Sequence, residues 1–326
     1  MSRARKMTRI LLVRLSSLGD VLHTFPAATD LRRAMPDAAL DWVVEEAYAP
    51  LVRMHPGVSR AIPFALRRWR RGLLAARAWR EFADFRATLG AHAYDAIIDA
   101  QGLVKSAAVA RLARGPVHGY GSVTARERFA AWLYDATHEI PRAEHSVHRY
   151  RALVARALDY RLQGPVDYGI VAPPAPVFAP NEPYCVLLHS TARAEKLWRE
   201  DAWVQVGRAL ESRQLACVLP WGSAGERSRA ERLTEFLAHA VVPPQMSMDE
   251  AAGLLGDAVA VIGLDTGLMH LAVALGVPVV GIYCNSEPAR TGPLGPGRIA
   301  VRGGRGRPPS PADVLDALGE VAPALA

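Results

Sequence analysis

Apolar residues follow two patterns along this chain: short continuous runs, and longer stretches in which they recur every three or four positions. A short continuous run is typical of a strand buried on both faces, whereas the longer spacing is typical of an amphipathic helix. In the first half these patterns predict strands near 8–15, 40–45, 61–63 and 95–99 and helices near 20–35, 46–55, 73–90, 103–113, 124–135 and 145–160. In the second half they predict strands near 184–189, 216–220, 240–242, 258–262 and 277–283 and helices near 200–213, 223–238, 248–255, 266–275 and 310–319.

The alternation of strands and helices predicts an α/β protein with parallel sheets. Residues 173–183 are rich in proline and lack periodicity, which is typical of a semi-rigid linker. We therefore expect two Rossmann-like, doubly wound domains, residues 1–172 and 184–326, that face a central cleft in which a ligand binds.

Composition supports this picture and gives the two halves different charge. The chain has 326 residues, of which 50% are apolar, and no apolar run reaches the roughly 18 residues of a membrane span. Residues 1–180 hold 26 Lys and Arg against 16 Asp and Glu, whereas residues 181–326 hold 13 against 16. The first half is therefore expected to attract anions.

The beginning of the chain and its cysteines predict a cytoplasmic protein with reduced thiols. The first residues are basic and then apolar, but Arg14 interrupts the apolar run and no small-residue cleavage site follows. Ile10–Leu15 is therefore expected to be the first strand. Cys185, Cys217 and Cys284 lie far apart without metal-ligand spacing, so we expect free thiols.

The richest motif is a strand, turn, helix and strand over residues 258–283. An apolar strand runs into Asp265-Thr266-Gly267, a helical pattern follows as far as Gly276, and a second buried strand comes next. The exposed amides and the dipole at a helix start favour a phosphate, and glycine permits close approach of the backbone. His270 shares the face of Thr266. The alternative is an ordinary turn in which Asp265 caps the helix.

A similar turn follows the first strand. Ser16, Ser17 and Gly19 allow a tight strand-to-helix turn at a place that suits a phosphate, although the stretch has neither a GxGxxG pattern nor a P-loop lysine. Asp20 ends this turn. It is either the cap of the following helix or a general base that removes a proton from an acceptor hydroxyl.

Polar residues also follow the predicted strands of the second half. Ser190 and Thr191 end its first strand, and Lys196 lies just beyond, where a lysine can neutralise charge on a leaving diphosphate; the alternative is a solvated loop cation. Glu226 opens a helix, where it could accept hydrogen bonds from a ribose or simply favour the helix dipole. Met246 could line a base pocket, although a core position is commoner for methionine.

Arginine and tryptophan alternate in a basic segment, Arg67-Arg68-Trp69-Arg70-Arg71. Such a segment can bind a nucleic acid, a membrane surface or a phosphorylated ligand, or it can be a solvated face. No nucleic-acid motif accompanies it, so we expect no nucleic-acid partner. Apolar residues at 69, 73, 74 and 82 suit an amphipathic element that touches lipid.

Three stretches together, 14–27, 187–198 and 263–283, resemble the bacterial heptosyltransferases of lipopolysaccharide inner-core assembly. They occur in the family's order, and the resemblance covers nearly the full chain. It implies a GT-B glycosyltransferase of family 9 that uses ADP-L-glycero-D-manno-heptose and forms its linkage with inversion, without an obligatory metal or other cofactor. The type I members, which the motifs resemble most, act on the Kdo of Kdo2-lipid A at the cytoplasmic face of the inner membrane. A peripherally attached monomer is expected.

The resemblance also implies residue roles. Asp20 would be the catalytic base, and Lys196 would hold the diphosphate as it leaves. The implied donor-binding positions are Ser190, Thr191, Lys196, Glu226, Met246, Asp265, Thr266, Gly267 and His270. The implied acceptor-binding positions are Ser16, Ser17, Gly19, Arg67, Arg68, Arg70 and Arg71.

One position departs from the family pattern and several alternatives stay open. The family is expected to have paired threonines where this chain has Thr191 followed by Ala192, and Ser190 could supply the missing hydroxyl. Within the family, a type II enzyme would act on a heptosylated acceptor instead. A nucleotide-sugar epimerase would need a second acid/base set, which the sequence does not offer. A non-catalytic lipopolysaccharide- or nucleotide-sugar-binding protein is the remaining alternative.

The last helix is expected near Pro311–Gly319, and fold analogy suggests that it packs back onto the first domain.

Overall fold

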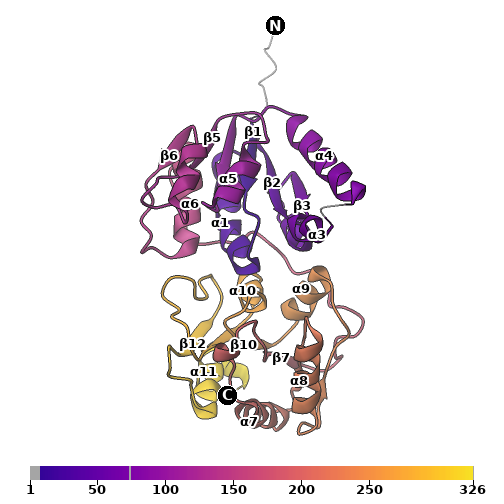
Figure 1. Cartoon of the computed structure of the whole chain (residues 1–326). Helices are drawn as coiled ribbons and strands as arrows, with labels where there is room; N and C mark the ends of the chain where they lie inside the picture. Colours follow the sequence, from indigo (N-terminus) through magenta and orange to yellow (C-terminus); the bar gives the residue numbers. More distant parts are fainter. Residues whose placement is uncertain (1–7, 73–74, 326) are drawn as a thin grey trace. The chain divides into compact units, whose positions relative to one another are not determined.

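The computed structural model describes residues 8–72 and 75–325, which form two compact units divided between residues 169 and 170. Each unit is an α/β structure built on its own six-stranded sheet (Figure 1). Residues 173–183 contain neither helix nor strand. The expected boundary at 172 stays a prediction, since the linker's part in either domain is not tested.

In the first unit every strand runs parallel to its neighbours, in the order β3-β2-β1-β4-β5-β6. The strands are β1 (Arg9–Val13), β2 (Ala39–Glu45), β3 (Arg60–Phe64), β4 (Ala96–Asp99), β5 (Val117–Tyr120) and β6 (Ala136–His138). The helices are α1 (Leu18–Ala34), α2 (Ala49–Arg53), α3 (Leu66–Arg71), α4 (Ala76–Gly90), α5 (Val104–Ala110) and α6 (Ser146–Ala157), with 3-10 turns η1 (Glu46–Tyr48) and η2 (Arg128–Leu133).

The second unit repeats this arrangement, with the parallel order β12-β11-β10-β7-β8-β9. Its strands are β7 (Tyr184–Leu188), β8 (Ala216–Val218), β9 (Ala240–Val241), β10 (Ala260–Leu264), β11 (Val279–Tyr283) and β12 (Ile299–Gly303). Its helices are α7 (Glu200–Glu211), α8 (Ala224–Thr234), α9 (Met248–Gly256), α10 (Gly267–Ala274) and α11 (Pro311–Val321), with 3-10 turns η3 (Ala194–Lys196) and η4 (Pro323–Leu325). Counted from the first strand of each unit, the two strand orders are the same.

The continuous apolar runs became the central strands, as the pattern predicts for strands covered on both faces. Leu11 and Ile97, which pair across β1 and β4, are fully buried, and so are Ile262 and Leu187 across β10 and β7. Strand order reverses direction between β1 and β4 and again between β7 and β10. Ligands of such sheets bind at the carboxyl edge beside these switch points, so each unit has one edge on which to look for a site.

The expected helix over 124–135 is wrong. Only the 3-10 turn η2 forms there, between two short strands, β5 and β6, that the sequence analysis did not predict. Both strands are only three or four residues long and contain a histidine, with glycine in β5 and threonine in β6, so neither gives an apolar run. Strand β12 was missed as well, because its VRG ending lies in a stretch rich in glycine and arginine.

Two expected helices differ in extent. The helix expected over 46–55 is divided into η1 and α2, with Pro50 in the first turn of α2. Helix α4 begins at Ala76, and the expected start at residues 73 and 74 lies outside the described residues.

The last helix, α11, packs against β11, β12 and α7 within its own unit. Its expected return to the first unit stays a prediction. Among the described residues, no helix is both long enough and apolar enough to span a membrane.

Candidate functional site

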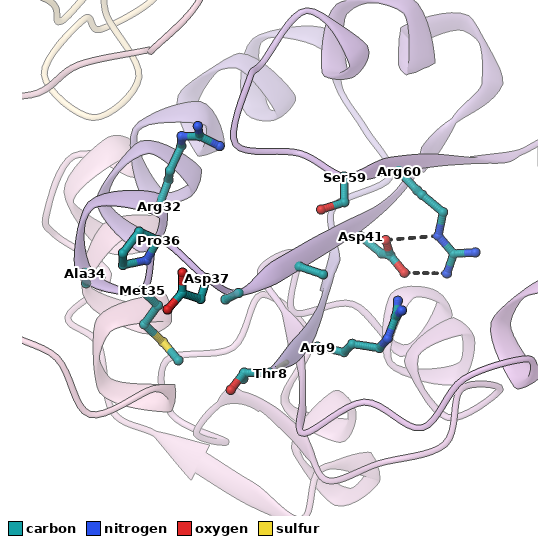
Figure 2. A pocket seen from close by; sticks show the side chains of 12 residues that line it. Thr8, Arg9, Arg32, Ala34, Met35, Pro36, Asp37, Asp41, Ser59 and Arg60 are labelled. Carbon is teal, nitrogen blue, oxygen red and sulfur yellow. Dashed lines mark hydrogen bonds and ion pairs between the residues drawn. The ribbon is translucent and has the colours of Figure 1, made fainter. Parts of the chain in front are cut away.

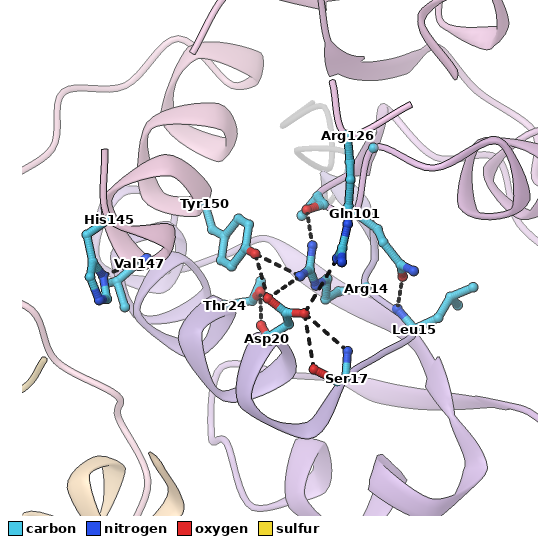
Figure 3. A network of polar contacts seen from close by, with 12 residues as sticks. Arg14, Leu15, Ser17, Asp20, Thr24, Gln101, Arg126, His145, Val147 and Tyr150 are labelled. Carbon is cyan, nitrogen blue, oxygen red and sulfur yellow. Dashed lines mark hydrogen bonds and ion pairs between the residues drawn. The ribbon is translucent and has the colours of Figure 1, made fainter. Parts of the chain in front are cut away.

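A buried arginine organises the carboxyl edge of the first sheet (Figure 3). Arg14 follows β1 directly, and its side chain is 2% exposed. Its Nη1 donates to the Ala100 carbonyl just beyond β4 at 2.6 Å, and its Nη2 lies 2.7 Å from Asp20 Oδ1. The guanidinium therefore spans the switch point and holds the Asp20 carboxylate beside it.

Asp20 is not the cap of helix α1, so that alternative is wrong. Ser17 is the capping residue and Asp20 is the third residue of the first turn, where its Oδ2 accepts from the Ser17 amide at 3.3 Å and the Ser17 hydroxyl at 3.2 Å. A carboxylate at this position completes a capping box. The same turn therefore ends the first strand, starts the helix and presents a carboxylate at the edge of the sheet.

The Asp20 carboxylate is held in its charged form. Burial alone would raise its pKa, but the Arg14 charge and hydrogen bonds from Tyr150 and Ser17 outweigh burial and lower the pKa of Asp20. Tyr150 lies on α6, which packs against α1, and its hydroxyl donates to Asp20 Oδ1 at 3.0 Å. Arg126 approaches Oδ2 to 4.0 Å, and the Asp20 side chain stays 20% exposed. Asp20 is therefore an ionised carboxylate that a ligand can reach.

The corresponding edge of the second sheet holds a lysine and an aspartate. Lys196 Nζ, in η3, lies 2.6 Å from Asp265 Oδ2 just beyond β10. The Ser286 hydroxyl donates to the same oxygen at 3.1 Å, and His270 Nε2 lies 3.8 Å from Oδ1. Burial would raise the pKa of Asp265, but hydrogen bonds from His270 and Lys196 outweigh it and hold the pKa far below its usual range. The edge therefore combines a fixed carboxylate with an ammonium group.

Helix α10 begins at this cluster. Thr266 is its capping residue and Gly267 its first residue, so the alternative in which Asp265 caps the helix is wrong. The Thr266 hydroxyl is buried and has no hydrogen-bond partner among the described residues. Asp265, Thr266, Gly267 and His270 thus lie together with Lys196 at the start of this helix. Their role in binding a phosphate stays a prediction.

Ser190 and Thr191 follow β7, the strand that pairs with β10. His189 before them is fully buried, and burial lowers its pKa to about 4. Its Nδ1 lies 2.8 Å from the Ser190 hydroxyl oxygen. Ser190 and Thr191 are therefore at the same carboxyl edge as Asp265, while their contact with a donor stays a prediction.

Glu226 and Met246 lie beyond the next two strands, β8 and β9. Glu226 Oε2 accepts from the amides of Gly222 and Ser223 at 2.7 and 3.1 Å, in a capping box at the start of α8. Half-buried Met246 comes directly before Ser247, the cap of α9. Each residue is thus placed at a helix start on the expected edge, and the ribose and adenine roles stay predictions.

The basic segment forms α3, and one of its arginines is held by two glutamates. Arg68 donates to Glu46 at 2.9 Å and to Glu81 at 2.5 Å. Trp69 is buried among Phe64, Phe82 and Phe85, so its expected contact with lipid is wrong: the indole fills the core and donates to Glu81. Leu73 and Leu74 of that expectation lie outside the described residues.

The other arginines of α3 lie at the surface. Arg67, Arg70 and Arg71 are exposed, and neither Arg70 nor Arg71 forms an ion pair with another described residue. They are the part of the segment that stays available to an anionic partner.

A pocket at the opposite, amino edge of the first sheet offers less chemistry (Figure 2). It includes the first residues of β1, β2 and β3, and its buried carboxylate, Asp41, is already occupied. Arg60 Nε donates to Asp41 at 3.1 Å and the Tyr94 hydroxyl donates at 2.9 Å. The buried carboxylate of this pocket is therefore already paired.

The three cysteines are free and buried, as expected, and burial raises the pKa of Cys185 and Cys217 to about 12 and that of Cys284 to about 11. No group of three or more His, Cys, Asp or Glu side chains that could hold a metal ion occurs among the described residues. That observation does not test the expected absence of a metal.

Sequence reasoning missed Tyr150, Arg126 and Ser286. Each is distant in sequence from the carboxylate it approaches, by 130, 106 and 21 positions, and reaches it only through the fold. No pattern around these residues signals such a contact. Arg14 entered the sequence analysis only as an interruption of an apolar run. A charged residue within such a run indicates a buried charge, so a signal for Arg14 was present.

Comparison with known proteins supports one family. The model of glycosyltransferase family 9 (heptosyltransferase) matches residues 82–313. The lipopolysaccharide heptosyltransferase 1 of Escherichia coli strain K12 is 43% identical over 304 residues, which cover 91% of this chain and 94% of that protein. The structure of E. coli heptosyltransferase WaaC with ADP has a TM-score of 0.90 at 40% identity, covering 97% of this chain and 100% of that chain. Its structure with ADP-2-deoxy-2-fluoro heptose has a TM-score of 0.87, covering 96% and 99%.

The E. coli relative covers 91% of this chain, and the family model extends from residue 82 in the first unit to residue 313 in the second. With its two Rossmann-like units of equal strand order, this chain belongs to glycosyltransferase family 9, the heptosyltransferases, and has their GT-B fold.

Proposed function

We propose that this heptosyltransferase moves L-glycero-D-manno-heptose from ADP-heptose to the Kdo of Kdo2-lipid A, with inversion at the anomeric carbon and without an obligatory metal. The name of the E. coli relative supports the type I reaction, and its complexes with ADP and a fluorinated ADP-heptose support the donor. The observation that carries the proposal in this chain is a difference in polarity: the first unit presents a carboxylate, and the second an ammonium beside a helix start.

The second unit would hold the donor. One N–H of the Lys196 ammonium is used on Asp265, which leaves two for the oxygens of a diphosphate. The Thr266 hydroxyl and the first amides of α10 add donors at the same place. Asp265 would accept hydrogen bonds from heptose hydroxyls, Ser190 and Thr191 would add hydroxyls, and Glu226 and Met246 would meet the nucleoside.

The first unit would hold the acceptor and start the reaction. Asp20 takes the proton of a Kdo hydroxyl as that oxygen forms a bond to the anomeric carbon. The bond between that carbon and the ADP oxygen breaks, its electron pair leaves with ADP, and Lys196 offsets the charge that develops on the diphosphate. Ser16, Ser17 and Gly19 would shape the acceptor end of this turn.

The decisive experiment measures ADP release by the purified protein with ADP-heptose, in the presence and absence of Kdo2-lipid A. We expect release only with the acceptor, and a product heavier by one heptose. Donor binding without release would contradict the type I assignment and lead to a heptosylated acceptor as the next test. Failure to bind ADP-heptose would overturn the proposed reaction as a whole.

The exposed arginines of α3 would contact the anionic acceptor and the inner leaflet. The enzyme would thereby attach to the cytoplasmic face of the inner membrane. It would act as a monomer, and it would have no nucleic-acid partner. The double variant Arg70→Glu/Arg71→Glu should lose co-sedimentation with vesicles containing phosphatidylglycerol, and wild-type binding should fall with salt. Arg86→Glu, an exposed arginine on α4, is the matched control. Equal binding by both variants would contradict this placement.

A further inference from the structure

The two oxygens of the Asp20 carboxylate have different surroundings. Oδ1 lies 2.7 Å from Arg14 Nη2 and 3.0 Å from the Tyr150 hydroxyl, and both of these groups are buried. Oδ2 has only the longer contacts, 3.2 and 3.3 Å, from Ser17 in the first turn of its own helix, with Arg126 at 4.0 Å. One oxygen is therefore fixed from within the core, and the other is held loosely.

The direction of the Tyr150 hydroxyl is determined by its neighbours (Figure 3). Arg14 Nη2 donates to the Tyr150 oxygen at 2.7 Å, and the guanidinium also lies over the tyrosine ring at 4.5 Å from its centre. Burial raises the pKa of Tyr150 to about 12, so the hydroxyl keeps its proton at neutral pH. With its oxygen accepting from Arg14, the single hydroxyl proton is left for Asp20 Oδ1.

We propose that Arg14 and Tyr150 are positioning residues that fix Asp20 by Oδ1 and thereby make Oδ2 the oxygen that takes the acceptor proton. The proposal rests on the proposed function, since it assigns the roles of two residues behind the base of that reaction. Neither residue is expected to touch the acceptor: Arg14 is 2% exposed and Tyr150 is 4% exposed.

The geometry explains how the Asp20 carboxylate can stay ionised and still present a defined oxygen to the acceptor hydroxyl. A free aspartate can turn about its side-chain bonds and offer either oxygen, so an acceptor hydroxyl would meet a distribution of orientations. A carboxylate clamped at Oδ1 offers one oxygen in a fixed position, and orientation of this kind contributes strongly to the rate of a proton transfer between bound groups. Asp20 has its second oxygen on the exposed side of the turn, where a ligand can replace the Ser17 contacts.

The charged and titratable groups that face this network come from several elements. Arg126 from the segment after β5 faces Oδ2, while Tyr120 at the end of β5 and Asp99 at the end of β4 influence Arg14. Arg14 is the cation nearest to the carboxylate. Removal of the Tyr150 hydroxyl takes away the hydrogen bond to Asp20 and the one from Arg14, and it changes no charge.

The test compares Tyr150→Phe with Tyr160→Phe in the full-length enzyme, using ADP release with ADP-heptose and Kdo2-lipid A. Tyr160 is a matched control, because its hydroxyl is also buried but has no hydrogen-bond partner among the described residues. We expect Tyr150→Phe to lower kcat by about 10- to 100-fold, as for a lost hydrogen bond to a charged group. The KM for ADP-heptose should stay within about twofold, and Tyr160→Phe should keep wild-type kcat.

The pH profile gives a readout that a purely structural role would not move. Loss of the Tyr150 hydrogen bond removes one cause of the low pKa of Asp20, so the acid limb of kcat/KM should lie at higher pH in Tyr150→Phe. Arg14→Gln should move the limb further, and Arg14→Lys, which keeps the charge, should bring it back toward the wild type. If the arginine variants do not fold, Tyr150→Phe alone decides.

Three results would overturn the assignment. The first is a kcat and pH profile for Tyr150→Phe that equal those of Tyr160→Phe. The second is a larger loss of kcat in Ser17→Ala than in Tyr150→Phe, which would make Oδ1 the reacting oxygen. The third is full turnover by Asp20→Asn, which would remove the base itself and with it the proposed mechanism. Loss of turnover in Asp20→Asn together with normal Tyr150→Phe would overturn the positioning roles alone.

Discussion

The carboxyl edge of each sheet holds a short ion pair beside its switch point, but the two pairs are arranged differently. In the first unit the cation is buried, with Arg14 2% exposed, and the Asp20 carboxylate is 20% exposed. In the second unit both partners are reachable, with Lys196 17% and Asp265 16% exposed, and the first amides of α10 lie next to them. The first edge therefore presents a proton acceptor, and the second presents N–H donors.

This difference shows how one topology can serve two halves of a reaction. Strand order is the same in both units, so the backbone brings loops to the same kind of edge in each. Which charge is buried is decided by the side chains at the strand ends: an arginine directly after β1, and a lysine eight residues after β7. Function belongs to these side chains rather than to the fold.

The largest expected effect separates the two carboxylates. Asp20→Asn should lower kcat by about 10²- to 10⁴-fold, because an amide cannot take the acceptor proton, while the affinity for ADP-heptose stays close to that of the wild type. Asp265→Asn should instead weaken donor binding. Steady-state kinetics and calorimetric titration with ADP-heptose measure both changes. Equal loss of donor affinity in the two variants would erase the functional distinction between the edges.

A smaller effect is expected from the lysine. Lys196→Met should raise the Kd for ADP-heptose by about 30-fold, as for the loss of charge-assisted hydrogen bonds to a diphosphate. Lys105→Met, which removes an exposed lysine of the first unit, is the control and should bind the donor as the wild type does. Unchanged donor affinity in Lys196→Met would place the diphosphate elsewhere.

A further effect concerns stability rather than activity, and it should be shared by both units. His55 in the first unit and His189 in the second have pKa values lowered by burial to about 4, below the ordinary value of 6.5. Between these values the unfolded chain binds more protons than the folded chain, so stability falls as pH falls from about 6.5 to 4, by up to about 3 kcal/mol for each histidine.

Urea unfolding at several pH values measures this dependence. The variants His55→Gln and His189→Gln should each flatten the slope between pH 6.5 and 4, whatever their stability at neutral pH. Exposed His239, replaced by Gln, is the control variant to which both slopes are compared. If neither buried histidine alters the slope, its protonation is not what destabilises the protein in acid.

Most of the fold could be predicted from the sequence because the central strands are continuous apolar runs. Strands β1, β7 and β10 are apolar over nearly their whole length. Such runs are typical of strands that are buried on both faces of a parallel sheet. The edge strands β6 and β12 escaped prediction for the same reason: they are short or partly polar and are held by hydrogen bonds to a neighbour. A pattern in one segment does not contain that neighbour.

The candidate site could be predicted as far as its residues follow a strand. Asp20, Lys196 and Asp265 each come just after a buried run, and their chemistry follows from residue type and position. Trp69 shows the limit of this reasoning, because its sequence neighbours are arginines and its spatial neighbours are phenylalanines. The composition of a segment does not distinguish surface positions from core positions when a short helix directs one of its side chains into the core.

The sequence by itself determined two α/β units and the acidic and basic side chains at the ends of their central strands. It did so because apolar periodicity and turn chemistry are local properties. Only the tertiary structure decided that Tyr150 reaches the Asp20 carboxylate across 130 positions and that Arg14 is buried at its side. The physical reason is that an ion pair's protonation and direction depend on the dielectric surroundings and hydrogen bonds supplied by elements distant in the chain, and these exist only once the elements have packed.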